Sequence, residues 1–550
     1  MKDRAWWDRR LSRRRLLAGG ASAAAATLLA ACAGGDGGPT ANETPAGGDE
    51  GPVKRGGIFR LPQGDPWPSM NPFLPGLSSL IQGLYLGYTV FDHLWFVPTD
   101  TGIRELFLAT SVEQPDDLTI IAQMGEAVFH DKPPVNGRKV LAQDVKASFE
   151  RFREVPPIGF SWLHHVLDHI EAPDDRTVIF RQKTPWGWVF TSSNAGSPIS
   201  SSIMPQEILH DDGLLNRDAI GSGRWMLAGH DNGANVRLRK FPNWRQPGLP
   251  YLDGVDFRLI TESAAEQAAL LAQDVDAIIL GFPTRLDAEA ARDQSNGRIR
   301  LSSDLSRSYR TLMLTWKEPF LDERVRRGIN LALDRQQLID AMDFGDGQMS
   351  GPLPPAHKRY VLDDSGLEEY FRHDAGEARK LLEAASFPFD REIELKFANS
   401  EDSTQLAQII EQQLRKVGIK LKLTGQDLII WLPQTLAAGN FQMTCFTHLP
   451  YEDADLPLRF YMSAETGQLS FMGYKDGEVD RAILAASREL DEGRRVELTK
   501  EAQRVLIRKW APMLNLYSPV AWNGAWDYVK GIVTGRGSII FFNTKVWLDK

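Results

Sequence analysis

The chain has 550 residues, a formal net charge of -9 and two cysteines, and 42% of its residues are hydrophobic. This length exceeds what one hydrophobic core usually serves, so we expect two or three domains. The acidic balance argues against a nucleic-acid partner, and two cysteines exclude a disulfide framework, so stability must come from core burial.

The first residues have the pattern of an export signal. Arg13 and Arg14 open an apolar run that ends in Leu29-Ala30-Ala31-Cys32 and is too short to span a bilayer comfortably. The Ser-Arg-Arg-x-Leu-Leu order resembles a twin-arginine (Tat) signal. Leu-Ala-Ala-Cys resembles the lipobox of bacterial lipoproteins, which implies that Cys32 carries a lipid. The alternative is an ordinary cleaved signal in which the cysteine falls by chance.

A tether and then a folded body are expected after this signal. We assign residues 1–31 to the signal peptide and 32–54, rich in Gly, Ala, Thr, Asp and Glu, to a disordered tether. Folding should start near Arg55, where Gly56–Leu61 gives a turn followed by an alternating strand. A buried helix is predicted from Gly83 to Trp95 and an apolar strand from Leu118 to Met124.

A helix with one apolar face is predicted from Asp144 to Phe152, because Val145, Phe149 and Phe152 follow the i, i+4, i+7 spacing. Asp144 lies in the first turn of this helix, where a carboxylate complements the helix dipole. The preceding Phe129-His130-Asp131 and this helix together resemble the signature region of the family 5 solute-binding proteins of ABC transporters.

Further motifs carry the same resemblance in the same order. A turn at Ala219–Trp225 is similar to Gly-Thr-Gly-Pro-Tyr, and Asp322–Arg335 has the string Asp-x-x-Val-Arg-x-x-Ile-x-x-Ala-Leu-Asp-Arg. Two shorter matches stand between them, at Pro250–Asp253 and Asp274–Ala277. The resemblance covers most of residues 55–533. It implies a receptor that binds a small solute without transforming it.

The second half contains a β-α-β pattern. Alternating residues predict strands at Ile393–Phe397 and Ile419–Leu423, and the helix between them should end at Gly418. Such a unit implies a parallel sheet. Before it, Asp322 and Asp334 are positioned to cap two successive helices. Two helical patterns from Ala482 to Trp510 and a strand at Met513–Tyr517 follow.

The resemblance implies an α/β fold of the two-lobed periplasmic-binding-protein type (type II, large peptide-binding subclass), with an extra α/β subdomain in the first lobe. The chain would cross between the lobes near Leu301–Lys317 and Leu514–Val529. The expected boundaries are 55–95, 190–300 and 520–550 for lobe I, 96–189 for its subdomain and 301–519 for lobe II.

The sequence offers little support for an enzyme, and no cofactor is expected. It lacks a phosphate-binding Gly-x-x-x-x-Gly-Lys, a Gly-x-Ser-x-Gly elbow, His-Glu-x-x-His and Cys-x-x-Cys. His165 and His169 could share one helical face, but two ligands without a third are a poor metal site, so none is predicted. His130 is expected to make structural turn hydrogen bonds, and Cys445 to be a small buried residue.

The predicted binding site lies where peptide-binding relatives carry Gly-Trp-x-x-Asp-Tyr-x-x-Pro, whose aspartate pairs with the ligand's ammonium group. The match selects Asp453, with Asp455 second, although Thr447-His448 replaces Gly-Trp. Both carboxylates could instead be capping or solvated loop groups. Flat aromatic side chains expected near the cleft edges are Trp431, Tyr451, Tyr309 and Trp522, each of which could equally belong to the core.

We therefore predict a monomeric, lipid-anchored receptor in the periplasm or on the outer face of the cytoplasmic membrane. It would close its two lobes on a solute, most simply a peptide, and pass it to an ABC permease driven by an ATPase subunit. An oligosaccharide or a metal chelate is the alternative ligand. The rival from another class is a Tat-exported enzyme.

Overall fold

The computed structural model describes residues 52–550, except 65, 68, 75–84, 97–103, 156–161, 192–200, 232–233, 452, 465–469 and 533–543. The predicted export signal with Arg13, Arg14 and Cys32, and nearly all of the tether, lie outside these residues. Glu50–Lys550 forms one compact unit. Among the described helices, none is both long and apolar enough to cross a bilayer.

The first strand of the described chain belongs to a four-stranded sheet built from distant segments. Its order is β1 (Ile58–Gln63), β10 (Gly254–Leu259), β9 (Asn235–Lys240) and β8 (Trp225–His230), with β1 parallel to β10 and the other pairs antiparallel. In β1 the side chains of Phe59 and Leu61 are buried and the one between them is less so, as in an alternating strand. The strand predicted within residues 56–61 is therefore confirmed.

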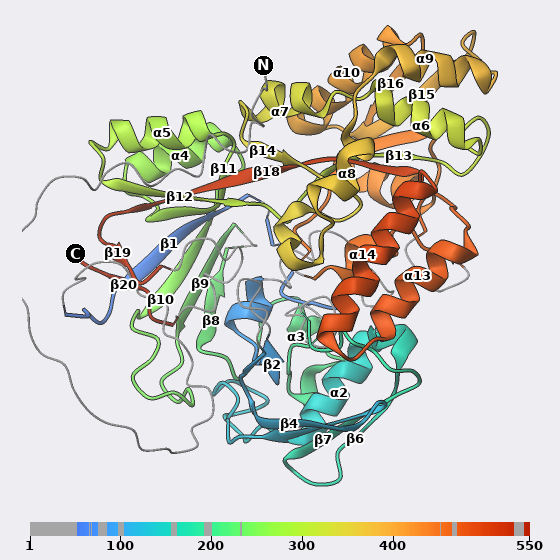
Figure 1. The fold of residues 1–550 in the computed structure, drawn as a ribbon. Coiled ribbons are helices and arrows are strands. Elements are labelled where there is room, and N and C mark those ends of the chain that lie inside the picture. The colour runs from blue at the N-terminus through green and yellow to red at the C-terminus, as the bar shows by residue number, and fades with distance from the viewer. Residues whose placement is uncertain are drawn as a thin grey trace, which may run out of the picture. The chain divides into compact units, whose positions relative to one another are not determined.

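A second, antiparallel sheet contains the order β4 (Ala109–Asp116), β5 (Thr119–Met124), β7 (Thr177–Gln182) and β6 (Leu167–Glu171). Helix α2 (Ala142–Arg153) contacts β7 and covers one face of this sheet (Figure 1). The predicted apolar stripe is confirmed, because Val145, Phe149 and Phe152 are buried. The Asp144 carboxylate accepts the Leu141 N–H at 2.9 Å and so stabilises the first turn.

A long strand connects the two halves of the largest sheet. Strand β18 (Met513–Trp526) pairs through its second half with β11 (Ala277–Phe282) and β12 (Ile299–Leu305), and through its first half with β13 (Arg310–Leu314) and β14 (Gly347–Met349). Beyond β13 the order continues through β17 (Met443–Thr447), β15 (Glu392–Ala398) and β16 (Lys420–Gln426). The strand predicted at residues 513–517 is thus the start of a longer one, seen in Figure 1 as the band between the two groups of strands.

The predicted β-α-β unit and the two helix caps predicted before it are confirmed. Strands β15 and β16 are parallel, and α10 (Glu401–Lys416) joins them and ends before Gly418, whose φ is +88°. Asp322 and Asp334 cap α6 (Glu323–Ala332) and α7 (Arg335–Asp343) by accepting backbone N–H groups. The two helices predicted after residue 482 are α13 (Gly477–Arg488) and α14 (Glu492–Arg508).

The remaining elements are short and join these layers. Small two-stranded sheets pair β2 with β3 and β19 with β20. The elements are β2 (Trp95–Phe96), β3 (Glu105–Leu106), β19 (Val529–Lys530), β20 (Trp547–Leu548), α3 (Asp212–Leu215), α4 (Ser263–Leu271), α5 (Arg285–Gln294), α8 (Asp364–Phe371), α9 (Ala375–Ala384), α11 (Leu428–Ile430), α12 (Asp455–Arg459), the 3-10 helices η3 (Gln206–Ile208) and η4 (Pro355–Tyr360), and the π-helices η2 (Trp162–Val166) and η5 (Trp431–Ala437).

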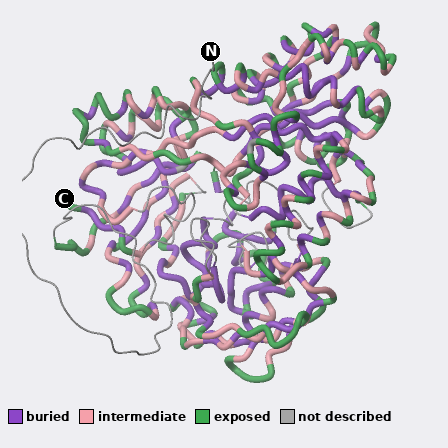
Figure 2. Tube along the Cα trace, in the orientation of Figure 1, coloured by how far each residue is buried: buried purple, intermediate pink, exposed green. Residues whose placement is uncertain are grey.

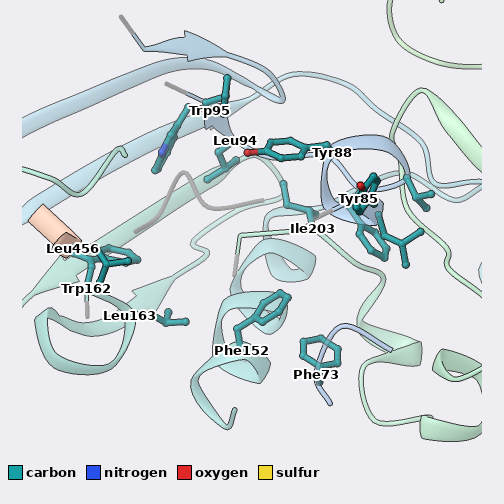
Figure 3. Close-up of a cluster of buried hydrophobic side chains, with 14 of the residues drawn as sticks. Phe73, Tyr85, Tyr88, Leu94, Trp95, Phe152, Trp162, Leu163, Ile203 and Leu456 are labelled. Atoms are coloured by element: carbon teal, nitrogen blue, oxygen red, sulfur yellow. The ribbon is translucent and has the colours of Figure 1, made fainter. Parts of the chain in front are cut away.

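Two hydrophobic cores hold the described residues together. One core lies between β13, β15, β16 and β17 and the helices α6, α7 and α10. The larger core extends from β1 to β20 and takes in residues of α12, α13 and α14. Figure 2 accordingly shows buried residues in both halves of the chain. Figure 3 shows part of the larger core, which includes both Leu456 of α12 and Trp162.

Two local predictions are wrong. The helix expected from Gly83 to Trp95 is helical only at residues 85–89 within the described chain, and Trp95 lies in strand β2. Asp92 leaves the helical path because it bridges to Ile203 and pairs with Arg245 at 2.5 Å. His165 and His169 do not share a helical face, because η2 ends at Val166 and His169 lies in strand β6.

Candidate functional site

The predicted site lies at the end of the β13–β17 ladder. The two strands are antiparallel, with Arg310 opposite Thr447. The ladder continues for one more pair, because the His448 N–H donates to the Tyr309 carbonyl at 2.9 Å. The rings of Tyr309 and His448 consequently stack, with centroids 4.2 Å apart and planes 12° from parallel.

A buried ion network anchors these two strand ends. The Arg310 guanidinium donates to Asp343, Asp402 and the Tyr517 hydroxyl. The Thr447 hydroxyl donates to Asp402 at 3.0 Å, so a single carboxylate bonds to both strands. Charge-assisted hydrogen bonds of this kind hold side chains in fixed orientations. The network therefore fixes the positions from which Tyr309 and His448 project.

Aromatic side chains surround the His448 imidazole on several sides. Its centroid is 4.4 Å from Phe446, 5.0 Å from Phe460 and 5.9 Å from Tyr451. Trp431 extends the group by packing on Phe446 at 5.3 Å. We call His448, Tyr309, Phe446, Phe460 and Tyr451 the imidazole cluster. Such a surface can hold a flat ligand group by stacking at little cost in side-chain entropy.

Three polar side-chain atoms of the cluster lack hydrogen-bond partners among the described residues. His448 is 2% exposed, yet neither of its ring nitrogens has a hydrogen-bond partner there. The Tyr309 hydroxyl is buried and unpartnered as well. Burial lowers the pKa of His448 to about 3 and raises the pKa of Tyr309, so both side chains are neutral near pH 7.

Asp453, the first predicted ligand contact, already bonds within the protein. It is 5% exposed, and it accepts the Thr191 hydroxyl at 2.5 Å. Its other oxygen accepts the backbone N–H groups of Asp455 and Leu456 at 3.2 and 3.1 Å, where α12 begins. These bonds at the start of α12 fit a capping role, which is one of the two roles that the sequence left open. A direct role in ligand binding stays a prediction.

Asp455, the second candidate, is also paired. It lies on α12 and accepts Arg459 Nε at 2.8 Å and the Ser487 hydroxyl at 2.7 Å. The guanidinium of Arg459 in turn lies 4.3 Å from the ring centroid of Trp186. A buried carboxylate with two such donors is compensated within the protein. Its role as a ligand contact likewise stays untested.

The aromatic candidates fall into two groups. Tyr309, Tyr451 and Trp431 are connected through the rings of Phe446 and His448, and Trp431 is buried with its Nε1 donating to Thr444 at 3.3 Å. Trp522 lies elsewhere, on β18 opposite Ser303 and Phe282.

Sequence reasoning did not select His448 or Thr191 as candidates. The signal for His448 was present, because an imidazole replaces the tryptophan of the expected motif. No signal pointed to Thr191, which lies 262 positions from its partner Asp453.

Two other candidates have the structural roles expected for them. His130 is buried, with Nε2 3.0 Å from the Gly223 carbonyl and Nδ1 accepting the Gly221 N–H at 3.3 Å. Cys445 is buried on β17 facing the smaller core, and burial raises the pKa of its thiol, which makes it unreactive.

The sequence matches the family described as bacterial extracellular solute-binding proteins, family 5 Middle, over residues 105–467. The glutathione-binding protein GsiB of Salmonella typhi is 25% identical over 448 residues, which cover 77% of this chain and 83% of that protein.

Solved structures share the fold. The periplasmic binding protein DppA from Helicobacter pylori, in complex with the peptide STSA, superposes with a TM-score of 0.75 at 23% identity and covers 90% of this chain and 99% of its own. The periplasmic EDTA-binding protein EppA gives a TM-score of 0.76 at 18% identity, with 91% and 98% covered. The expected two-lobed, type II α/β class is thereby confirmed.

Proposed function

Because this chain belongs to family 5 of the bacterial extracellular solute-binding proteins, we propose that it captures a peptide and delivers it to the permease of an ABC importer. The observation that carries the proposal is the agreement of nearly the whole fold with a peptide-bound receptor, DppA from Helicobacter pylori. The family binds solutes and its relatives are transport receptors, so no reaction is assigned to the chain. Its partners would be the permease and an ATPase subunit.

The proposed capture step is closure of two lobes. Lobe I would comprise 55–95, 190–300 and 520–550 with a subdomain at 96–189, and lobe II would comprise 301–519. Strand β18 supports this division, because its second half pairs with β12 and its first half with β13. A ligand that touches both lobes binds the closed form better and shifts the population toward it.

Within the site we propose Tyr309, Tyr451 and Trp431 as the aromatic surface that receives the ligand. Their connection through the rings of His448 and Phe446 supports this assignment. For Asp453 and Asp455 we propose a role through α12, since both are engaged by protein donors there. Trp522, in the second half of β18, would meet the ligand only as a contact from lobe I.

We further propose that the mature protein is a monomeric lipoprotein outside the cytoplasm. The lipobox-like sequence that ends at Cys32 and the twin-arginine pair Arg13-Arg14 support lipid attachment and Tat export. Two or three acyl chains at about 0.8 kcal/mol for each buried methylene would hold the protein at the membrane almost permanently.

A metal chelate is the second candidate ligand. The description of EppA as an EDTA-binding protein favours it, because that protein shares the fold at a TM-score of 0.76. A chelate would be held as an organic anion, so it predicts cationic groups in the site. Peptide remains the primary proposal because the imidazole cluster offers neutral aromatic surface.

Thermal unfolding in the presence of candidate ligands tests this proposal. We expect the melting temperature of the purified chain to rise with peptide mixtures and to stay constant with oligosaccharides and EDTA complexes, since a ligand at 100 times its Kd adds about 2.7 kcal/mol. A shift only with a metal complex would replace peptide by chelate. No shift with any of the three classes would remove the receptor proposal.

A further inference from the structure

Two buried histidines of this protein differ in one respect. His130 and His448 are both enclosed, and burial lowers their pKa values to about 4 and about 3. His130 uses both ring nitrogens, one on the Gly223 carbonyl and one on the Gly221 N–H. His448 uses neither among the described residues. The first has the bonds of a structural histidine, and the second has none of them.

An unpaired buried polar atom is costly. Leaving a donor or acceptor without a partner costs about 1–3 kcal/mol, and most buried polar groups in proteins are paired for that reason. The imidazole cluster holds three such atoms on two stacked residues: both ring nitrogens of His448 and the hydroxyl of Tyr309. A phenylalanine at either position would keep the stacking without this cost. The three atoms are therefore suited to a partner that arrives from outside.

The described carboxylates nearest the cluster in sequence or through Thr447 already accept hydrogen bonds from protein donors. Asp453 accepts three protein donors at the start of α12, and Asp455 accepts two. Asp402, behind Thr447, is bonded to Arg310. An ammonium group would have to compete with these donors for a carboxylate, whereas an uncharged amide can bond to a neutral imidazole and a phenol without a counterion.

Resting on the proposed function, we propose that His448 and Tyr309 form an uncharged polar subsite for an amide group of the ligand, so that the bound peptide presents an acylated amino terminus here rather than a free ammonium. A neutral imidazole supplies one N–H donor and one acceptor, and a phenol can do both. An amide offers the complementary carbonyl acceptor and N–H donor, and its flat shape suits the rings of Phe446 and Phe460, whose centroids lie 4.4 and 5.0 Å from that of His448.

Retention of two peptide pools by the purified chain tests this subsite. One pool is a random tetrapeptide mixture, and the other is the same mixture with acetylated amino termini. Peptides retained after equilibrium dialysis are counted by mass spectrometry. We expect the acetylated pool to be retained at least about tenfold better, which corresponds to about 1.4 kcal/mol.

Three variants locate the effect. His448→Phe and Tyr309→Phe keep the aromatic packing and should each reduce retention of the acetylated pool about tenfold, with no loss of melting temperature. The matched control, His130→Phe, removes two satisfied hydrogen bonds and should lower the melting temperature while leaving the preference between pools unchanged.

The outcomes separate the subsite from the proposed function. Better retention of the free pool, or an acetylated preference that survives both substitutions in the cluster, overturns the subsite while peptide binding stands. Retention of neither pool overturns the peptide ligand and this subsite together. Preferential retention of the acetylated pool that both substitutions abolish supports the subsite.

Discussion

Gly187 offers a sharp test of lobe closure, because it lies where the proposed lobes touch. It sits between Trp186 and Trp188, after β7, and its N–H donates to the Ser487 carbonyl of α13 at 2.8 Å. The guanidinium of Arg495 lies 5.0 Å from the ring centroid of Trp188. In the proposed division this segment is in or beside the first-lobe subdomain, and its partners belong to lobe II.

The substitution Gly187→Ala introduces one methyl group at this contact. A Cβ there would lie 2.0 Å from the Glu489 carbonyl oxygen and 2.7 Å from Arg495 Nη1. The first neighbour is backbone and cannot rotate away, so the segment must move. Overpacking of this kind costs about 1–3 kcal/mol, which corresponds to a fall in ligand affinity of about 5-fold to 150-fold if only the closed form carries the contact.

Calorimetric titration with a ligand found in the thermal screen measures this fall. The matched control is Gly376→Ala in α9, where the nearest atom is Asp374 Oδ1 at 3.4 Å and the position is exposed, so affinity should stay constant. Unchanged affinity in Gly187→Ala would refute the closure contact. A clear loss of melting temperature without ligand would show instead that the segment is permanently packed, and the proposed lobe boundary would be wrong.

Three further outcomes are expected. The pKa of His448 falls from 6.5 to about 3 on folding, so below pH 6.5 protons bind the unfolded chain first and the free energy of unfolding falls. Urea unfolding should show that the wild type loses about 2 kcal/mol more than His448→Phe between pH 7 and pH 5, and equal losses would refute the assignment. Cys32→Ala should move the protein from the membrane to the soluble fraction on immunoblots of cell fractions, and replacing Arg13 and Arg14 by lysine should retain it in the cytoplasm; normal fractionation would remove the anchor and the Tat route. Asp453→Asn should lower the free energy of unfolding by about 1–2 kcal/mol through its cap and its Thr191 bond while changing affinity less than tenfold, and the opposite pattern in unfolding and titration would make it a ligand contact.

Local sequence patterns predicted the elements that local physics decides. Asp322 and Asp334 each precede an apolar face at helical spacing, and both cap a helix in the structure. The alternating residues on either side of α10 form parallel strands, as a β-α-β unit requires. Each cap and each strand pattern lies within a short stretch of sequence, so these elements can be predicted from the sequence.

Predictions failed where distant residues compete with local preference. The helix expected through Trp95 ends early, because Asp92 bonds to Arg245, 153 positions away. The ligand role of Asp453 stays a prediction, but its bonds to Thr191 and to the start of α12 could not be foreseen from the sequence. That the ring nitrogens of His448 have no partner in the described part of the chain could not be inferred from the sequence, since it is a property of the packed cluster. These features depend on which distant residues meet in the folded protein.

Saturation binding followed by recovery of the ligand tests the central claim most directly. The purified chain is titrated with a peptide from the retained pool, the complex is isolated and denatured, and the released ligand is weighed by mass spectrometry. We predict saturation at one ligand per chain and recovery of the peptide with unchanged mass. A product of altered mass, or the absence of saturable binding, would contradict a receptor that carries its solute without transforming it.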